Sequence, residues 1–367
     1  MKRFLAVSLM VLLVAGSLFA TGNVERGGGI QVDVFWYMFG DTFLTSVRNA
    51  MAAEFSLHSD FRVTHHDCNN DQTRQTQMIQ TAITQGSRLL IVNIVTTGSE
   101  EAAMNIVDMA RRANVPIIFF NREVSDNVIR SYANAAFVGT DADEAGYMQG
   151  EAIAKFLLRP ENWTGNRSNF DLNGDGRINY IMLRGEHGNA EAFGRTKYSV
   201  EEANRQLAGR LQLAPSPANQ TSTQYENDGI SNFFLYANWS AAEAANLMRT
   251  ALTAHSLTTG AIELIIANND DAAIGAIEAM NEQGFNTGRE GAGYIPVFGV
   301  DATSVAVQAI NSGRMTGTIL QSATGMAETI VALARNIANG QHVFANTARF
   351  NVDEGVNKIR VPYAIVE

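Results

Sequence analysis

The feature that most constrains the fold of this chain is a repeated alternation of short apolar runs with longer amphipathic stretches. The runs "LLIVNIV" (89–95) and "VPIIFF" (115–120) are apolar on both faces, and an amphipathic stretch (99–114) separates them. Strands that are apolar on both faces and alternate with helices are typical of a parallel sheet covered by helices on two sides. The alternation therefore predicts an α/β protein.

The alternation runs through the chain twice. With 367 residues, the chain is also long for a single hydrophobic core. We therefore expect two doubly wound parallel-sheet domains. The first contains strands at 32–38, 61–67, 89–95, 115–120 and 136–141, and the second contains strands at 178–185, 211–213, 262–268, 295–301 and 317–321.

The C-terminal segment adds a helix (323–340) and a strand (358–366) that the second half does not need. We expect this segment to return to the first domain and then to the second, so that several crossings form a hinge. The crossings are predicted near Thr140, near Gln321 and at 351–355. The predicted boundaries are 31–139 plus 324–353 for the first lobe, and 140–321 plus 356–367 for the second.

The first twenty residues have the pattern of a secretory signal peptide. Lys2 and Arg3 precede an apolar stretch (4–14) and a run of small residues (15–20). The apolar stretch is too short for a stable membrane span. Residues 21–30 are interpreted as a flexible leader, and no cysteine near the exit supports a lipoprotein anchor. We therefore expect a periplasmic protein.

Composition limits the classes of partner. The chain is 46% hydrophobic and 17% charged, as expected of a globular protein. Its net charge is −10, and without residues 1–20 it has 25 basic and 37 acidic side chains, or −12. Because phosphate contacts dominate nucleic-acid affinity, this balance argues against a nucleic-acid partner. Cys68 is the only cysteine, so no intramolecular disulfide can form. We expect a monomer.

Polar and aromatic residues gather where the predicted strands end, which is where open α/β sheets bind ligands. Carboxylates and amides can each bridge two neighbouring hydroxyls, an arginine adds a fork of donors, and flat rings pack on the C–H face of a sugar. The set therefore favours a neutral polyol over a phosphate, for which the chain has no Gly-rich cradle. Its members are Asp41, Phe43, Asn121, Glu186, Asn189, Glu191, Arg195, Asn268, Asn269, Asp270, Asp301 and Gln321, with Trp239 at the start of a helix.

Each of these residues also has a structural interpretation. Polar residues at strand ends are common as helix caps and turn formers, and Phe43 or Trp239 taken singly is more typical of a core. The signal is the recurrence of the set at the same end of both sheets. The segment "HHDC" (65–68) hints at a metal, but strand alternation turns its neighbouring side chains to opposite faces, which favours a strand-end turn.

The segment "DLNGDGRIN" (171–179) follows the first nine positions of an EF-hand calcium loop. Asp171, Asn173 and Asp175 place side-chain oxygens at every second position. The twelfth position, which is a bidentate Glu in an EF-hand, is Met182, and a thioether is a poor ligand for calcium. The pattern by itself leaves two interpretations: a calcium site completed from elsewhere, or an Asx turn without metal.

Several segments together carry a resemblance to a known family. In order along the chain these are "DTF", "NNDQTRQ", "VPIIFFNRE", "FVGTD", "DLNGDGRIN", "GRTKY", "ANNDDAAIGAIEAM", "IPVFGVDA" and "RVPY". With them, the chain resembles the periplasmic glucose/galactose-binding proteins, the type 1 solute receptors of sugar ABC importers. The resemblance implies a protein that closes on one monosaccharide, D-glucose or D-galactose, and delivers it to the membrane subunits of an ABC permease.

The resemblance also implies two sets of site residues. In the family, a Glu at the start of a distant strand completes the shell of a structural Ca²⁺, and Glu263 occupies that position here. The implied calcium ligands are Asp171, Asn173, Asp175, the Arg177 carbonyl, Asn179 and Glu263. The implied sugar ligands are Asp41, Phe43, Asn121, Asn189, Glu191, Arg195, Trp239, Asn269, Asp301 and Gln321, with Phe43 and Trp239 as two aromatic plates.

Three positions depart from the family pattern. Asn189 stands where the family has His, Glu191 where it has Asp, and Gln321 where it has Asn. Asn cannot carry the proton that His can, and Glu and Gln are each one methylene longer than the residues they replace. The resemblance therefore supports hexose binding more strongly than a choice between epimers.

The sequence also bears on three alternative functions. A ligand-sensing repressor needs an N-terminal helix-turn-helix, where this chain has a signal-peptide pattern. A secreted carbohydrate-active enzyme would use two carboxylates such as Asp41 and Asp301, and needs one of them raised in pKa across a scissile bond. The sequence leaves this enzymatic function open, although we expect no enzyme. A sensor that presents bound sugar to a chemoreceptor is compatible with transport.

Overall fold

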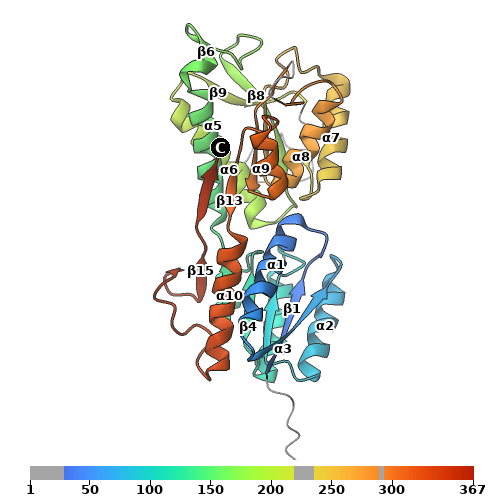
Figure 1. Ribbon diagram of the computed structural model, residues 1–367, viewed down its shortest axis with the longest axis vertical. Coiled ribbons are helices and arrows are strands. Elements are labelled where there is room, and N and C mark those ends of the chain that lie inside the picture. The colour runs from blue at the N-terminus through green and yellow to red at the C-terminus, as the bar shows by residue number, and fades with distance from the viewer. Residues whose placement is uncertain (1–28, 219–234, 289–292) are drawn as a thin grey trace, which may run out of the picture.

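The computed structural model of the protein describes residues 29–218, 235–288 and 293–367. The predicted signal peptide and most of the predicted leader lie outside these residues. Figure 1 shows two lobes arranged one above the other along the long axis of the molecule. In the described part of the chain, no helix has both the length and the apolar character needed to cross a membrane.

The first lobe is built on a seven-stranded sheet. Its elements are β1 (Ile30–Trp36), α1 (Thr42–Ser56), β2 (Phe61–Asp67), α2 (Gln72–Thr84), β3 (Leu89–Val92), α3 (Glu100–Ala113), β4 (Ile117–Phe120), α4 (Asp126–Arg130), β5 (Ala135–Gly139), α10 (Ala323–Ala338), β14 (Asn351–Val352) and β15 (Lys358–Arg360). The strand order is β14-β15-β5-β4-β3-β1-β2, and every neighbouring pair except β14 with β15 is parallel. Strands β3 and β4 are buried along their whole length, as their apolar runs predict.

The second lobe repeats this plan with another seven-stranded sheet. Its elements are α5 (Ala142–Leu157), η1 (Pro160–Asn162), β6 (Trp163–Thr164), β7 (Arg167–Ser168), β8 (Arg177–Arg184), α6 (Ala190–Leu207), β9 (Gln212–Pro215), β10 (Leu235–Tyr236), α7 (Ala241–Ala254), β11 (Leu264–Ala267), α8 (Asp270–Asn281), β12 (Val297–Asp301), α9 (Ser304–Asn311), β13 (Gly317–Gln321) and β16 (Tyr363–Val366). The order is β10-β8-β11-β12-β13-β16, with β9 also beside β8. Only β16 runs antiparallel to its neighbour within the described part of this sheet.

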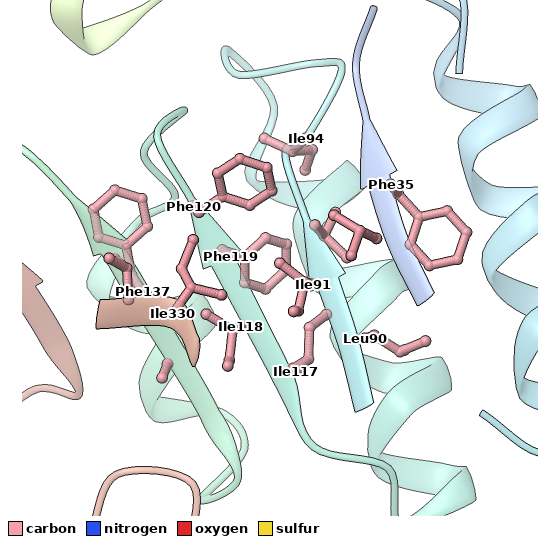
Figure 2. Close-up of a cluster of buried hydrophobic side chains, with 14 of the residues drawn as sticks. Phe35, Leu90, Ile91, Ile94, Ile117, Ile118, Phe119, Phe120, Phe137 and Ile330 are labelled. Carbon is pink, nitrogen blue, oxygen red and sulfur yellow. The ribbon is translucent and has the colours of Figure 1, made fainter. Parts of the chain in front are cut away.

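The core of the first lobe joins residues that are distant in the sequence. Figure 2 shows Ile330 from α10 near Phe137 from β5 and Ile118 from β4, with Phe35 from β1 on the far side of the same cluster. All four side chains are fully buried in one apolar cluster. Removing such side chains from water is the main stabilising contribution to a fold of this kind. Helix α10 is therefore part of the first lobe, although it follows the last helix of the second lobe in the sequence.

The described chain passes between the lobes three times, and the third passage differs from the prediction. The first two lie after β5 at Thr140 and after β13 at Gln321. We expected one strand at 358–366 and a crossing at 351–355. Instead, β15 pairs with β5 in the first sheet, whereas β16 pairs with β13 in the second.

The break lies at Pro362, which has no N–H to donate to a ladder and so separates the two strands. Val356, Ile359 and Val361 all belong to the core of the first lobe. The predicted boundary at 356 is therefore wrong: the first lobe includes residues up to 361, and the second lobe resumes at Tyr363.

Candidate functional site: a cleft between the lobes

A cavity of about 40 Å³ lies between the lobes, at the carboxyl ends of their parallel strands. Every residue of the implied sugar set lines this cavity, although these residues are spread from position 41 to position 321. Tyr37, Leu44 and Arg122 also line it, and sequence reasoning did not name them. Three other strand-end candidates, Glu186, Asn268 and Asp270, do not line it. The strand-end residues that line the cavity meet because both sheets direct the ends of their parallel strands to the same cleft.

The first lobe contributes residues that follow β1 and β4. Asp41 caps α1, because its Oδ1 accepts a hydrogen bond from the backbone N–H of Leu44 (2.8 Å), while its Oδ2 accepts one from the hydroxyl of Tyr37 (2.8 Å). Asn121 has a left-handed backbone with φ of 59°, and its Oδ1 accepts a hydrogen bond from Asn93 Nδ2 (3.2 Å). Asn is among the non-glycine residues that adopt this conformation most readily. Asp41 therefore caps α1 and also lines the cavity.

Arg122 is the main addition to the site. It is 4% exposed, and its guanidinium lies 4.1 Å from the centre of the Tyr37 ring. Its Nη2 donates to Glu186 of the second lobe, while its Nε and Nη1 have no partner among the described residues. Its position directly after Asn121 in "FFNRE" was the available signal, since it follows the same strand end. Its two unused donors can serve oxygen atoms of a ligand.

Helix α6 carries three site residues in its cap and first two turns. Asn189 is the N-cap, and its Oδ1 accepts a hydrogen bond from the N–H of Ala192 (3.0 Å). Glu191 is 4% exposed, and within the described part of the chain neither of its carboxyl oxygens has a hydrogen-bond partner. Burial raises the pKa of Glu191 to about 7, although the nearby charge of Arg195 lowers it. A buried polar group without a hydrogen-bond partner lowers the stability of the fold. A ligand that donates hydrogen bonds to Glu191 would remove this penalty.

Arg195 and Asp301 lie opposite each other in the second lobe. Arg195 Nη1 donates to the carbonyl of Asn268 (2.8 Å) and lies 3.7 Å from Asp301 Oδ1. Burial raises the pKa of Asp301 well above its ordinary value, and Arg195 only partly offsets this. Asp301 also has a φ of 122°, a strained backbone for a residue with a side chain. Arg195 Nε has no partner among the described residues, so it remains available to a ligand.

The two aromatic rings of the set come from opposite lobes. Phe43 lies in the first turn of α1, and Trp239 precedes α7 with a left-handed φ of 65°. A Cβ on Gly185 would lie 2.3 Å from the Trp239 ring, so the ring can take this position only beside a glycine. Asn269 Nδ2 donates to the carbonyl of Trp239 (3.1 Å), which fixes the loop. The cavity is therefore lined by a ring from each lobe.

Glu186 holds the two lobes together across the cleft. It follows β8 in the second lobe, and its Oε1 accepts hydrogen bonds from Thr97 Oγ1 (2.8 Å) and from Arg122 Nη2, both in the first lobe. Sequence reasoning placed Glu186 at a strand end and gave it no role. The observed arrangement is therefore one in which the lobes are in contact around the cavity.

The segment 171–179 comprises a loop (171–176) and the first three residues of β8, and it lies next to Glu263, which directly precedes β11. Both carboxylate oxygens of Asp171 accept backbone N–H groups of the loop, at 2.7 to 3.1 Å. Glu263 Oε1 accepts the N–H of Leu172 (2.7 Å), and its Oε2 accepts the N–H of Asn179 (2.8 Å). The distant residue implied by the resemblance therefore does lie against the loop.

The chemistry of this loop fits a hard cation. Among residues 29–218, 235–288 and 293–367, no three His, Cys, Asp or Glu side chains have the spacing of metal ligands. The loop instead combines carboxylate, amide and carbonyl oxygens, the mixture that Ca²⁺ prefers. Asp171 is 4% exposed and Glu263 is fully buried. Two carboxylates buried near each other are costly without a compensating charge, so a calcium ion suits the residues present.

The "HHDC" segment is the end of β2, and its side chains separate as alternation predicts. Trp36 Nε1 donates to Nδ1 of His65 (3.0 Å), whereas Nε2 of His66 hydrogen-bonds to Asp33 (2.8 Å). Cys68 is buried beside Gln75. Each histidine therefore has a structural partner, and the strand interpretation accounts for the segment.

Comparison with known proteins identifies the family. A model of the periplasmic binding protein domain matches residues 32–342. The chain belongs to the periplasmic binding protein domain family. Among its relatives, the D-galactose/methyl-galactoside binding periplasmic protein MglB of Haemophilus influenzae is 30% identical over 100% of this chain and 97% of its own length. The ribose import binding protein RbsB of Escherichia coli is 24% identical over 78% of this chain and 77% of its own length.

Solved structures of the family have the same architecture. An ABC transporter solute binding protein from Bacillus halodurans, with bound myo-inositol, is 26% identical, has a TM-score of 0.67, and matches over 93% of this chain and 96% of its own. This match confirms the α/β fold with two parallel-sheet domains that the sequence predicts. The chain is a type 1 sugar solute-binding protein of the ABC-importer class.

Proposed function

We propose that this protein captures D-glucose or D-galactose between its lobes and delivers it to an ABC permease. The observation that carries the proposal is the single cavity lined by the whole implied sugar set, with members from both lobes. Because each lobe supplies only part of the set, a sugar makes all its contacts only when the lobes are together. The sugar therefore favours the closed form, which is the form that a permease recognises.

The chemistry of the lining supports a neutral hexose. Two buried arginines, Arg122 and Arg195, keep unused N–H donors, and Glu191 keeps two unused oxygens. Phe43 and Trp239 offer flat faces from opposite lobes. Relatives named for galactose and for ribose, and a solved relative with myo-inositol, all match this chain. The preference for a hexose rests on the site residues and on the higher identity to the galactose-binding relative.

We also propose that the loop at 171–179 and Glu263 hold a structural Ca²⁺. The ligands would be the side chains of Asp171, Asn173, Asp175, Asn179 and Glu263 with the Arg177 carbonyl. The ion would supply positive charge that offsets the buried carboxylates. It would connect the loop to β11 and stabilise the second lobe without contact to the sugar.

Sensing and catalysis are the two alternatives to transport. A sensor would present the same closed form to a chemoreceptor, so it shares the proposed ligand and differs only in the partner. An enzyme would turn the sugar over, and membership of a solute-binding family supports a non-enzymatic role. Recovery of unchanged D-galactose or D-glucose after prolonged incubation with the protein distinguishes binding from turnover.

The decisive experiment is isothermal titration calorimetry of residues 21–367 with D-glucose, D-galactose, D-ribose and myo-inositol. We expect one-to-one binding of a hexose and much weaker binding of the pentose and the cyclitol. Removing calcium with a chelator should leave the hexose affinity nearly unchanged. Stronger binding of ribose or myo-inositol than of both hexoses would contradict the proposed ligand.

A further inference from the structure

Each of the three passages between the lobes carries one buried polar side chain, and the three side chains meet in one hydrogen-bond network. Thr140 lies at the first passage, Gln321 at the second and Tyr363 at the third. They are 0%, 2% and 5% exposed. All three join a network with Arg195, which lines the ligand cavity, whereas Thr140 and Tyr363 do not line it.

The hydrogen bonds of this network form a closed ring. Arg195 Nη2 donates to Gln321 Oε1 (3.3 Å) and to the hydroxyl of Tyr363 (3.1 Å). Thr140 Oγ1 accepts from Gln321 Nε2 (3.2 Å) and lies 2.7 Å from the hydroxyl of Tyr363. Because a guanidinium can only donate, the hydroxyl of Tyr363 accepts from Arg195, while either hydroxyl can be the donor between Tyr363 and Thr140. Two paths therefore start at Arg195 Nη2, one through Gln321 and one through Tyr363, and both end at the hydroxyl oxygen of Thr140.

The ring connects the ligand cavity to the first lobe through the hinge. Thr140 is the residue at which the chain leaves β5, and its carbonyl also accepts a hydrogen bond from Arg360 Nη1 in β15 (2.8 Å). Arg195 has its Nη1 on the carbonyl of Asn268 and its Nη2 in the ring, which leaves Nε for a ligand. The amide of Gln321 has a protein partner at each end, although Gln321 lines the cavity.

We propose that Thr140, Gln321 and Tyr363 are positioning residues that couple the orientation of Arg195 to the angle of the hinge. The ring holds the guanidinium ready for the ligand, so that less freedom is lost on binding. The same ring ties the three passages together, so a ligand that engages Arg195 also favours the closed hinge. Only the affinity part of this inference rests on the proposed function.

The test removes one hydroxyl of the ring at a time. Tyr363→Phe and Thr140→Val each keep the side-chain shape and delete one member of the network. Tyr132→Phe is the matched control, since the Tyr132 hydroxyl is buried in the first lobe and has no partner among the described residues. Spin labels on cysteines introduced at the exposed positions Gln80 in α2 and Glu278 in α8 report the distance between the lobes. Calorimetry with D-galactose and D-glucose reports affinity.

We expect Tyr363→Phe and Thr140→Val each to broaden the distance distribution between the lobes without sugar and to weaken hexose binding roughly tenfold, because each leaves a buried polar group unpaired. The double variant should bind about as weakly as either single variant, since both changes break the same ring. Two independent structural defects would instead multiply to roughly a hundredfold loss. Tyr132→Phe should match the wild type in both measurements.

The outcomes separate this inference from the proposed function. If Tyr363→Phe and Thr140→Val match Tyr132→Phe in both the distance distribution and the affinity, the ring has no positioning role. If they differ from it in only one of the two measurements, the ring does not couple Arg195 to the hinge. If the wild type binds neither hexose, the proposed ligand is wrong. The hinge part of the inference then stands or fails on whether Tyr363→Phe and Thr140→Val broaden the distribution.

Discussion

Two buried glutamates of the second lobe, Glu191 and Glu263, have the same altered acidity in opposite surroundings. Burial raises the pKa of each to about 7. Neither oxygen of Glu191 has a hydrogen-bond partner in the described chain, whereas each oxygen of Glu263 accepts a backbone N–H. Glu191 lines the cleft between the lobes, and Glu263 lies against a loop within one lobe.

The difference shows how a binding cleft and a structural loop can be told apart. A buried group whose hydrogen bonds are unmet is stabilised only when something else arrives, so the cleft is organised for a ligand. A buried group that its own chain satisfies helps to hold one local conformation. We therefore expect changes in the cleft to alter hexose affinity, and changes in the loop to alter stability while hexose affinity stays nearly unchanged.

The largest effect is expected from Arg195→Ala in the cleft. The change removes a ligand-facing guanidinium and leaves Asp301 buried without its charge partner, so hexose affinity should fall roughly a thousandfold, about 4 kcal/mol. Titration calorimetry measures the loss, and unfolding with and without calcium tests the loop. Arg205→Ala, exposed on the same helix, is the control. If calcium no longer stabilises Arg195→Ala against unfolding, the cleft and the loop are not independent.

The next effect concerns the pH dependence of stability. Glu191 has a raised pKa because it is buried, with Arg195 on its own helix and Arg122 and Glu123 from the first lobe as the facing charges. The folded protein favours its neutral form, so the contribution of Glu191 is fully present below about pH 4.5 and is lost as the pH rises through about 7. The loss is up to about 3 kcal/mol. Urea unfolding of ligand-free Glu191→Gln should show a flatter pH profile than the wild type across this range. Parallel profiles would mean that Glu191 is stabilised by a group outside the cavity.

Glu263→Gln tests the other side of the comparison. If the loop binds calcium, saturating the ion at a hundredfold excess over its dissociation constant should stabilise the wild type by about 2.7 kcal/mol. The variant should lose most of this gain and keep its hexose affinity within about twofold. Thermal unfolding with calcium and with chelator measures the gain, and Glu278→Gln, exposed on α8, is the control. Equal calcium stabilisation of the variant and the wild type would remove Glu263 from the site.

The smallest effect is expected from Trp239→Ala. Loss of the aromatic plate should weaken hexose binding roughly tenfold through lost packing on the sugar face. Trp163→Ala is a matched control in the same lobe, because Trp163 lies outside the cavity lining. Calorimetry with the preferred hexose decides the matter, and equal affinities for the two variants would contradict the role of Trp239 as a plate.

Much of the site was predictable because strand ends are local features. Asp41, Asn121 and Asn269 each follow an apolar run that is readable as a strand, and parallel sheets bring such ends to one edge. Arg122 was missed although it follows Asn121, because a charged residue one position further on is usually exposed. Only its packing over Tyr37 and its pairing with Glu186 bring it into the cavity.

The C-terminal segment shows a feature of the fold that local sequence patterns do not predict. The segment 358–366 was predicted as one strand, although it contains Pro362. Its two halves lie in different sheets because Pro362 interrupts the ladder and because each half finds a different neighbour, β5 or β13. Strand partners are long-range choices that no local pattern encodes.

The sequence alone determined the α/β class, the two similar halves and the ends of the strands at which ligand-facing residues gather, since these follow from the period of apolar residues and from local turn chemistry. The tertiary structure decided the lobe to which each end of the C-terminal segment belongs. It also placed Glu263 against the loop at 171–179 and closed the ring of Thr140, Gln321, Tyr363 and Arg195. The physical reason is the same in each case: these contacts join residues far apart in the chain, and only packing of both lobes sets their distances.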